Sequence, residues 1–373
     1  MIENRAAVVR KRPSWQNSGF CHAGVATSVG SPTGIGYCME TDLPAFSLAK
    51  TLGVLPGSDW FPSSAREPAC LLSMAATLAA PFSGSTLLAC LLARHSQLSS
   101  DGEIFPLEAT NSVICSCGKK QLECPYYRQA AGHMLGPDGK SWDEALFAPC
   151  PAYSRFTLID KALGRLWGNS ALRLAQRCLR RIPLWRRRDQ AFVAAHLRFM
   201  QNSLRLRQAR VYVDGSKSVR RARLFARSGG VHLKVIQVVR DGRAFCFSYL
   251  KNHELPRTHL PAATRAWLKN LKAVERFHAL FPHVPVLNVR YEDLCRDLPE
   301  TMHRVCQFLA VPYEPTREYS DARPCHVLGN RMRLTFSGQI QENLRWQAEF
   351  PPEDIAFLNR TLRPHLERYQ YSL

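Results

Sequence analysis

Residues 81–88, with the sequence Pro-Phe-Ser-Gly-Ser-Thr-Leu-Leu, decide how the surrounding chain can be arranged. The uncharged, mostly apolar run at 71–78 predicts a buried strand before them, and leucines recur at helical spacing after them. A strand, a tight loop and a helix N-terminus make an anion site, because free backbone N–H groups and the helix dipole converge there. Ser83, Ser85 and Thr86 can donate further hydrogen bonds to the anion. The stretch therefore predicts a phosphate-binding loop.

The loop departs from the phosphate loops of kinases and other nucleoside triphosphatases. It lacks the Lys that precedes Ser or Thr in GxxxxGK[ST] and that contacts the β- and γ-phosphates. We therefore expect it to hold a phosphate without ATP chemistry, which disfavours a P-loop kinase. Taken alone, residues 83–86 also fit an ordinary polar turn, so other parts of the chain must decide.

The rest of the chain alternates between apolar runs and helical patterns. Strands are predicted at 211–214, 231–239 and 285–290, and helices from about 219, 242 and 299 and over 263–281. Strands that alternate with helices indicate parallel β-α-β units. The expected fold is therefore an α/β, P-loop-like three-layer sandwich: a central parallel sheet flanked by helices, plus a helical insertion.

Ligands of such sheets bind beyond the carboxyl ends of the strands. The loop at 81–86, Lys217, Arg240 and Tyr291 all follow predicted strands and should meet at that edge. The polar residues 99–104 predict a loop after the first helix, and this loop carries the carboxylate of Glu103.

The composition points to anionic partners. The 373 residues include 50 Lys and Arg against 30 Asp and Glu, a formal charge of +20. A membrane-surface or nucleic-acid-binding protein is therefore an alternative. The arginines are dispersed, however, and no nucleic-acid motif with interleaved aromatics is present, so we expect no nucleic-acid partner. Peripheral contact with the inner face of a membrane stays open.

Targeting and redox signals favour the cytoplasm. The 13 cysteines are an odd number, and no signal-peptide pattern opens the chain, so reduced thiols are expected. Residues 69–93 carry no charge, but Pro81, Gly84 and several hydroxyl residues argue against a membrane-spanning helix.

Two segments stand apart from the predicted sheet. Residues 1–65 are rich in Gly, Ser, Pro and Thr without periodicity, and we expect a loose extension outside a folded domain of residues 66–373. Residues from about 105 to 210 form a basic, helical insertion. Most of its arginines fit a solvated helix face, and an anionic-substrate cap or a membrane-surface patch are the alternatives.

Three cysteines lie within ten residues, Cys115, Cys117 and Cys124. With Cys150 or His133 they could bind zinc, although their spacing matches no common C-x2-C pair. The favoured interpretation is a compact knuckle of reduced cysteines that packs a loop, and the predicted site contains no metal.

Four motifs in this order resemble the sulfotransferase family that uses 3′-phosphoadenylyl sulfate (PAPS), over a region from about residue 68 to the C-terminus. They are the loop at 81–88, Val239-Arg240 with Ser248 eight residues on, the segment 289–294 (Val-Arg-Tyr-Glu-Asp-Leu), and Gly329-Asn330-Arg331-Met332-Arg333 with Trp346 after it. The spacing of the second motif makes physical sense, because Arg at a strand end can fork onto a phosphate while Ser projects from the next helix. The cysteine knuckle and the ending Tyr369-Gln370-Tyr371 are similar to those of bacterial members.

The resemblance implies which residues bind PAPS. Residues at the 5′-phosphosulfate would be Phe82, Ser83, Gly84, Ser85, Thr86 and Leu87. Arg240 and Ser248 would grip the 3′-phosphate, Tyr291 would lie near the nucleotide, and Asn330, Arg331 and Arg333 would close over the 3′-phosphate.

This chain departs from the family pattern at two positions. Members usually carry Lys or Arg where this chain has Phe82, and Lys217 is the best substitute, with Arg333 another. Many members use a His as general base, whereas Gly102-Glu103 is similar to the GE context in which tyrosylprotein sulfotransferases place a catalytic Glu. Lys217 could also be a solvated lysine at a helix start, and Glu103 a loop carboxylate or salt-bridge partner.

The implied activity is in-line transfer of the sulfuryl group of PAPS to a hydroxyl or amine, leaving adenosine 3′,5′-bisphosphate. Glu103 would accept the acceptor's proton, while the N–H groups of residues 83–86 and Lys217 hold charge on the 5′-phosphate. The acceptor, whether sugar, peptide, lipid or small molecule, cannot be identified from the residues.

Overall fold

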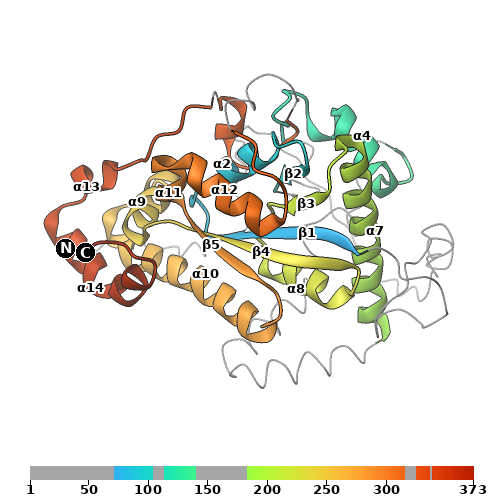
Figure 1. Cartoon of the computed structure of the whole chain (residues 1–373). Coiled ribbons are helices and arrows are strands. Elements are labelled where there is room, and N and C mark those ends of the chain that lie inside the picture. The colour runs from blue at the N-terminus through green and yellow to red at the C-terminus, as the bar shows by residue number, and fades with distance from the viewer. Residues whose placement is uncertain (1–70, 104–112, 140–182, 316–324, 337) are drawn as a thin grey trace, which may run out of the picture. The chain divides into compact units, whose positions relative to one another are not determined.

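The computed structural model describes residues 71–103, 113–139, 183–315, 325–336 and 338–373. Within them the chain forms a five-stranded, fully parallel sheet in the order β2-β3-β1-β4-β5 (Figure 1). The strands are β1 (Leu72–Ala79), β2 (Leu98–Gly102), β3 (Val211–Asp214), β4 (Val231–Val239) and β5 (Val286–Arg290). The predicted α/β fold with a central parallel sheet is confirmed. The proposed extension at 1–65 and the part of the insertion at 140–182 lie outside the described residues.

Strand β1 is the centre of the sheet. It pairs with β3 from Met74 to Ala76 and with β4 along its whole length, from Leu72 to Ala79. Both of its edges are therefore paired, and helices pack on both of its faces, which explains why its sequence carries no charge. The membrane-span alternative for residues 69–93 is excluded by the same geometry, because residues 72–79 are a strand and residues 85–92 a separate short helix. Among the described helices, none combines the length and apolar character that crossing a membrane requires.

Helices cover both faces of the sheet and its carboxyl end. The α-helices are α2 (Ser85–Leu92), α4 (Pro125–Ala131), α7 (Pro183–Arg207), α8 (Val219–Ser228), α9 (Gly242–Asn252), α10 (Leu260–Leu280), α11 (Tyr291–Arg296), α12 (Leu298–Leu309), α13 (Arg345–Glu349) and α14 (Pro352–Arg368). Short 3-10 helices are η1 (Gln121–Glu123), η2 (Gly132–Met134), η3 (Arg257–His259) and η5 (Arg331–Leu334).

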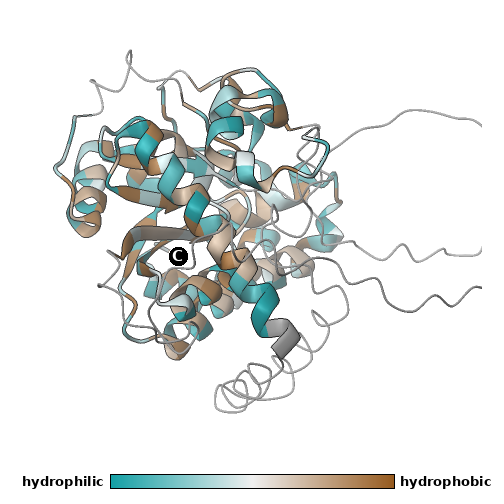
Figure 2. Ribbon diagram, turned by 90° about the vertical axis from the view of Figure 1, so that its right-hand side faces the viewer, coloured by the Kyte–Doolittle hydropathy of each residue, from teal (hydrophilic) through white to brown (hydrophobic). Residues whose placement is uncertain are grey.

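The core consists of apolar clusters that follow the alternation of the strands. Met74 and Leu78 of β1 face α4, α7, α8 and α10, whereas Ala75 faces α2, α11 and α12. A further cluster around Trp267 joins α9, α10 and α14 beyond the end of β4. The hydropathy of the ribbon alternates along these helices, as amphipathic packing requires (Figure 2).

Predicted and observed elements agree closely for the strong periodic segments. The strands predicted at 211–214 and 231–239 are β3 and β4, and the strand predicted at 285–290 is β5. The amphipathic helix predicted at 263–281 is α10, at Leu260–Leu280. Apolar periodicity identified these elements because their burial pattern repeats with the helix or strand period.

The loop predicted at 99–104 was wrong, because residues 98–102 form the edge strand β2. Its letters, Leu-Ser-Ser-Asp-Gly, resemble a turn, yet all five residues are buried. Hydrogen bonds inside the protein satisfy the side chains of Ser99 and Asp101. The Ser99 hydroxyl lies 2.6 Å from that of Ser203, and the Asp101 carboxylate accepts a bond of 2.6 Å from the Tyr126 hydroxyl. Hydrogen bonds from distant residues therefore stabilise β2 without the usual alternation of apolar residues, and the local sequence does not reveal these partners.

The outer edge of β2 is covered by a late segment of the chain. Gly102 bridges Leu328 in parallel, with Leu328 N donating to Asp101 O over 2.9 Å and Glu103 N donating to Leu328 O over 3.1 Å. These bonds bring residues 325–330 beside the strand that precedes Glu103. The edge is thereby closed against further pairing.

Burial of Asp101 makes a pH-dependent prediction. Burial raises the pKa of this carboxyl above its ordinary value of 3.8, although Arg207 and the Tyr126 hydroxyl oppose the shift. A carboxyl with a raised pKa in the folded state contributes stability below the unfolded pKa and loses it as pH rises through the folded pKa. Asp101→Asn does not titrate. The free energy of unfolding of the wild type minus that of Asp101→Asn should therefore decrease as pH rises from about 4.

Urea unfolding of both proteins across the pH range measures this difference. A difference that grows with pH would contradict the raised pKa.

Candidate active site

The loop between β1 and α2 has the geometry of an anion site. Gly84 is the N-cap of α2 in the left-handed region, at φ 82°, and its carbonyl accepts the first helical bond from Leu88 N. Ser83, Ser85 and Thr86 are buried around this turn. A Cβ on Gly84 would collide with Cδ2 of Tyr291, so only glycine allows the ring to approach.

Arg240 follows the end of β4 and binds the loop directly. Its Nη1 donates to the Phe82 carbonyl over 2.8 Å and to the Ser248 hydroxyl over 3.1 Å, and its guanidinium lies 4.7 Å from the centroid of the Tyr291 ring. The structure thus brings together the predicted Arg240–Ser248 pair, the loop and Tyr291. Arg240 is 6% exposed. Its buried Nε has no hydrogen-bond partner among the described residues, so it can donate to an anion.

Tyr291 is the first residue of α11 and lies where β5 ends. Its hydroxyl donates to the Gln341 carbonyl over 3.3 Å, and burial raises its pKa. The aromatic ring contacts both Gly84 of the loop and the guanidinium of Arg240, and its hydroxyl stays neutral at physiological pH.

Glu103 and Lys217 meet after the ends of β2 and β3. Glu103 Oε1 lies 2.6 Å from Lys217 Nζ, and the side chains are 17% and 18% exposed. Lys217 has φ 57°, and its loop is anchored by the buried ion pair between Asp214 and Arg221. Lys217 and Ser83 of the phosphate loop both line a small cavity.

The late loop at 329–333 closes this group of residues from another side. Asn330 N donates to Thr86 Oγ1 over 3.2 Å, and the Asn330 side chain accepts from Met332 N over 3.1 Å at the start of η5. Gly329, at φ 137°, approaches both Thr86 and Glu103: a Cβ there would lie 2.9 Å from Thr86 Oγ1 and 3.3 Å from Glu103 Oε1. The loop therefore touches both the phosphate loop and the carboxylate.

The two predicted arginines of this loop differ in their surroundings. Arg333 is buried, and its guanidinium donates to the backbone carbonyls of Gly329 and Ile114, while burial lowers its pKa. Its Nε has no partner among the described residues. Arg331 is exposed at the start of η5. Arg333 thus braces the loop, and Arg331 is the arginine that can move toward a ligand.

Two other predicted positions can contribute only through their backbone. The Phe82 side chain packs edge-on to His253, with ring centroids 5.8 Å apart, and it is the Phe82 carbonyl that meets Arg240. The Leu87 side chain is buried between α2 and the sheet. The Phe82 side chain supplies no cation to the loop.

A buried network beside the site was missed at the sequence level. Glu292 accepts bonds from Asp241 N over 2.9 Å and from the Tyr371 hydroxyl over 2.8 Å, and burial raises its pKa. Arg243 binds both oxygens of Asp241 and the carbonyl of Ser372. These bonds tie the ends of β4 and β5 to the C-terminal residues. Glu292 lies within the motif at 289–294, so the motif marked the position without revealing its partners.

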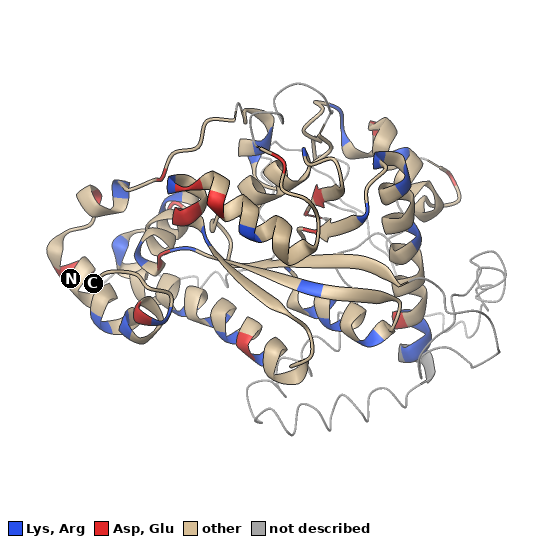
Figure 3. Cartoon of the chain, in the orientation of Figure 1, with Lys and Arg blue, Asp and Glu red and all other residues tan. Residues whose placement is uncertain are grey.

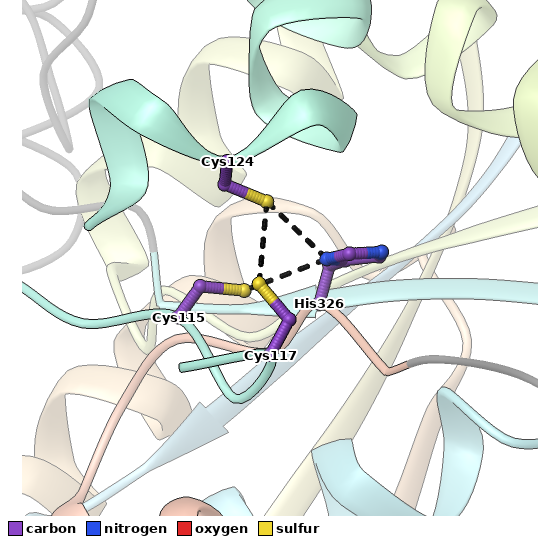
Figure 4. A group of neighbouring side chains, drawn as sticks. All are labelled: Cys115, Cys117, Cys124 and His326. Carbon is purple, nitrogen blue, oxygen red and sulfur yellow. Dashed lines mark hydrogen bonds between the residues drawn. The ribbon is translucent and has the colours of Figure 1, made fainter. Parts of the chain in front are cut away.

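The cysteine cluster has a different fourth member from the predicted ones. Cys115, Cys117 and Cys124 surround His326, which lies on the segment beside β2 (Figure 4). His133 is elsewhere: its Nε2 lies 2.9 Å from the Ala195 carbonyl oxygen. The predicted alternative ligand His133 is therefore wrong, because α7 rather than the knuckle holds this ring. Cys150 lies outside the described residues.

A comparison with protein families found one match in the chain. Residues 232–315 match the model of the sulfotransferase family. The matched segment runs from β4 to the residues after α12 and contains Arg240, Ser248 and Tyr291. The resemblance stated from the motifs is confirmed over this segment. A search of curated proteins found no match.

Solved structures with some likeness are also sulfotransferases by description. The sulfotransferase domain of the curacin biosynthetic pathway is 17% identical, with a TM-score of 0.45, and the likeness covers 82% of this chain and 100% of that one. The sulfotransferase domain of the Synechococcus PCC 7002 olefin synthase is 19% identical, with a TM-score of 0.42 and coverage of 83% and 100%. A Mycobacterium avium sulfotransferase is 13% identical, with a TM-score of 0.39 and coverage of 82% and 79%.

The contact between Gly84 and Tyr291 predicts a costly substitution. Gly84→Ala adds a methyl group at positive φ and forces it against the Tyr291 ring. We expect a loss of about 2–4 kcal/mol in the free energy of unfolding, the sum of backbone strain and overpacking. Urea unfolding, monitored by circular dichroism, measures the loss.

Gly338→Ala is the matched control, because Gly338 has φ 89° and no atom within 4 Å of the added Cβ. It should cost about 1–2 kcal/mol from strain alone. Equal losses in the two variants would show that the packing of Tyr291 on the loop contributes nothing.

Proposed function

We propose that this protein is a PAPS-dependent sulfotransferase that transfers a sulfuryl group to a hydroxyl or amine of an acceptor. The observation that carries the proposal is the buried Arg240, bonded to the Phe82 carbonyl and to Ser248 and stacked on Tyr291. These groups lie at the carboxyl edge of a parallel sheet, and three of them lie in the segment that matches the sulfotransferase family. Sulfuryl transfer is the general chemistry that this match supports.

The residues fit a donor that carries two phosphate groups. The Nε atom of Arg240 is a buried donor without a partner among the described residues, and Ser248 supplies a hydroxyl next to it, so together they suit a 3′-phosphate. The turn at 83–86 offers N–H groups at the start of α2 for the 5′-phosphosulfate. Asn330, Arg331 and Arg333 would close over the nucleotide from the late loop.

The donor supplies an activated sulfuryl group whose bond to the 5′-phosphate breaks as the acceptor's bond to sulfur forms. In this scheme Glu103 accepts the proton that the acceptor hydroxyl or amine loses. The Glu103 carboxylate has two oxygens, so its bond to Lys217 through Oε1 leaves capacity for an acceptor proton. The N–H groups of the loop and Lys217 stabilise the negative charge left on the phosphate oxygen.

Lys217 supports this scheme by its position. Its Nζ lies 2.6 Å from Oε1 of the proposed base Glu103, and it lines a small cavity together with Ser83 of the loop. A lysine on a flexible stem can reach either partner. We propose that it replaces the cation absent at Phe82.

Lys and Arg lie on helices of both faces of the sheet, intermixed with Asp and Glu (Figure 3).

The alternative functions, a kinase or a surface-binding protein, can be distinguished from a sulfotransferase by the ligand that stabilises the chain. If the proposal is right, adenosine 3′,5′-bisphosphate should raise the midpoint temperature of thermal unfolding. A shift with ATP–Mg²⁺ instead would favour a kinase, and a shift with oligonucleotides or anionic vesicles would favour a surface-binding protein at a membrane or nucleic acid. Incubation with labelled PAPS and candidate acceptors then identifies the acceptor.

The role of Arg240 gives a binding prediction. Arg240→Ala removes a charge-assisted fork, so the affinity for adenosine 3′,5′-bisphosphate should fall by about 2–4 kcal/mol, while adenosine 5′-phosphate is affected less. Isothermal titration measures both affinities. Arg276→Ala, at an exposed position of α10, is the control and should bind as the wild type does. Unchanged bisphosphate binding in Arg240→Ala would contradict the assignment of the 3′-phosphate site.

The roles of Glu103 and Lys217 give a kinetic prediction. Glu103→Gln should keep the affinity for the bisphosphate and lower turnover by roughly 10²–10⁴, the usual effect of a lost general base. Lys217→Ala should lower both turnover and affinity, because the cation contacts the donor before and during transfer. Initial rates with labelled PAPS and the acceptor found in the screen measure these effects.

Phe82→Lys tests whether the two positions share one role. The double variant Phe82→Lys/Lys217→Ala should recover part of the turnover lost in Lys217→Ala. Full activity in Glu103→Gln would show that another residue is the general base. A double variant no more active than Lys217→Ala would show that positions 82 and 217 do not share a role.

A further inference from the structure

We propose that Cys115, Cys117, Cys124 and His326 bind a structural zinc ion. Their ligand atoms, three sulfurs and one ring nitrogen, all lie within 4.8 Å of one another (Figure 4). Cys115 and Cys124 are fully buried, whereas Cys117 is exposed at the surface of the group. This inference does not depend on the proposed sulfuryl transfer.

Three of the six distances between the ligand atoms match the edges of a zinc tetrahedron, and the remaining ones are at most 4.8 Å. Zn–S bonds of about 2.3 Å and Zn–N bonds of about 2.0 Å at tetrahedral angles put two sulfurs about 3.8 Å apart and a sulfur and nitrogen about 3.5 Å apart. The Sγ atoms of Cys117 and Cys124 are 3.7 Å apart. His326 Nδ1 lies 3.6 Å from Cys115 Sγ and 3.3 Å from Cys124 Sγ. The atoms already stand where zinc would hold them.

A disulfide does not account for this arrangement. A sulfur–sulfur bond is about 2.05 Å long, and the cysteines of the cluster are free at separations far beyond that. A disulfide also would not explain the histidine, which comes from a segment about 200 residues later and presents Nδ1 to two of the sulfurs. A soft, four-coordinate cation explains all four donors at once.

The backbone holds the ligands in place from both segments. Residues 115–119 form a tight turn, with Cys115 N donating to Lys119 O over 2.8 Å and Gly118 N donating to Cys115 O over 2.9 Å. His326 is fixed through its carbonyl, which accepts a bond of 2.7 Å from the Tyr127 hydroxyl, and through its ring, which stacks on Tyr126 at 4.7 Å. Such preorganisation is typical of a structural site.

Further bonds join the two ligand segments beside the metal position. The Ser116 hydroxyl donates to the Cys325 carbonyl over 2.6 Å and accepts from Val327 N over 2.9 Å. Ser116 N donates to the Val327 carbonyl over 3.2 Å. The ion would therefore cross-link the knuckle at 113–124 to the segment that covers β2.

The chemistry of the donors selects the metal and its role. Three thiolates and one imidazole form the Cys₃His set typical of closed, four-coordinate structural zinc. All four positions are taken by protein ligands, so no coordination site remains for a substrate or water. Thiolates must lose their protons on binding, so zinc uptake releases protons and weakens at acid pH.

Metal analysis of the purified full-length chain tests the proposal. The protein is prepared without chelators, dialysed and analysed by plasma mass spectrometry, and about one zinc per chain is expected. Reconstitution with Co²⁺ should give thiolate charge-transfer bands and the visible absorption of a tetrahedral site. A chain that holds no stoichiometric zinc and gives no tetrahedral cobalt spectrum overturns the proposal, and so does stoichiometric iron in place of zinc.

Variants assign the ligands. Cys124→Ser and His326→Ala should each lower zinc affinity roughly tenfold or more, measured by competition with a chromophoric chelator. His326→Cys supplies a thiolate at the same place and should retain zinc. Cys306→Ala removes a buried thiol of α12, and His133→Ala removes the ring beside Ala195; both should retain zinc at the wild-type level. Wild-type affinity in Cys124→Ser and His326→Ala would also overturn the assignment, and the wild-type metal content decides the matter where a variant fails to fold.

Discussion

A buried guanidinium organises the proposed active site. Removing a charge from water costs several kcal/mol unless hydrogen bonds and other charges replace the solvent. Apart from its Nε, Arg240 meets this requirement with the Phe82 carbonyl, the Ser248 hydroxyl and the face of Tyr291. Each partner comes from a different element, so the burial of one side chain fixes the phosphate loop, α9 and α11 relative to the end of β4.

Much of this arrangement could be predicted from the sequence, because local patterns determine it. Apolar periodicity identified β1, β3, β4, β5 and α10, and parallel alternation then placed Lys217, Arg240 and Tyr291 at one edge. The proximity of Arg240 and Ser248 could be predicted because it depends only on one strand end and the helix that follows it. The close pairing of Glu103 with Lys217 was not predicted, because it depends on β2, the strand that was predicted as a loop.

The features that were missed depend on contacts between distant parts of the chain. Strand β2 can be polar because partners on α4 and α7 bind Ser99 and Asp101, and nothing in its five-residue sequence reveals them. His326 joins the cysteines because Leu328, two residues later, bridges Gly102 of β2, a contact across more than 200 residues. Phe82 contacts Arg240 through its backbone carbonyl rather than its side chain, and a backbone contact cannot be predicted from the identity of the residue.

The position of β1 has a consequence for biosynthesis. This strand is made first among the five, yet its neighbours are β3 and β4, which begin at Val211 and Val231. More than 130 residues must leave the ribosome before β1 can pair on either side. During that interval an apolar strand has two open edges, which exposes the nascent chain to aggregation and makes it a natural client for chaperones. Long-range parallel pairing also slows folding, so the phosphate loop attached to β1 is completed late.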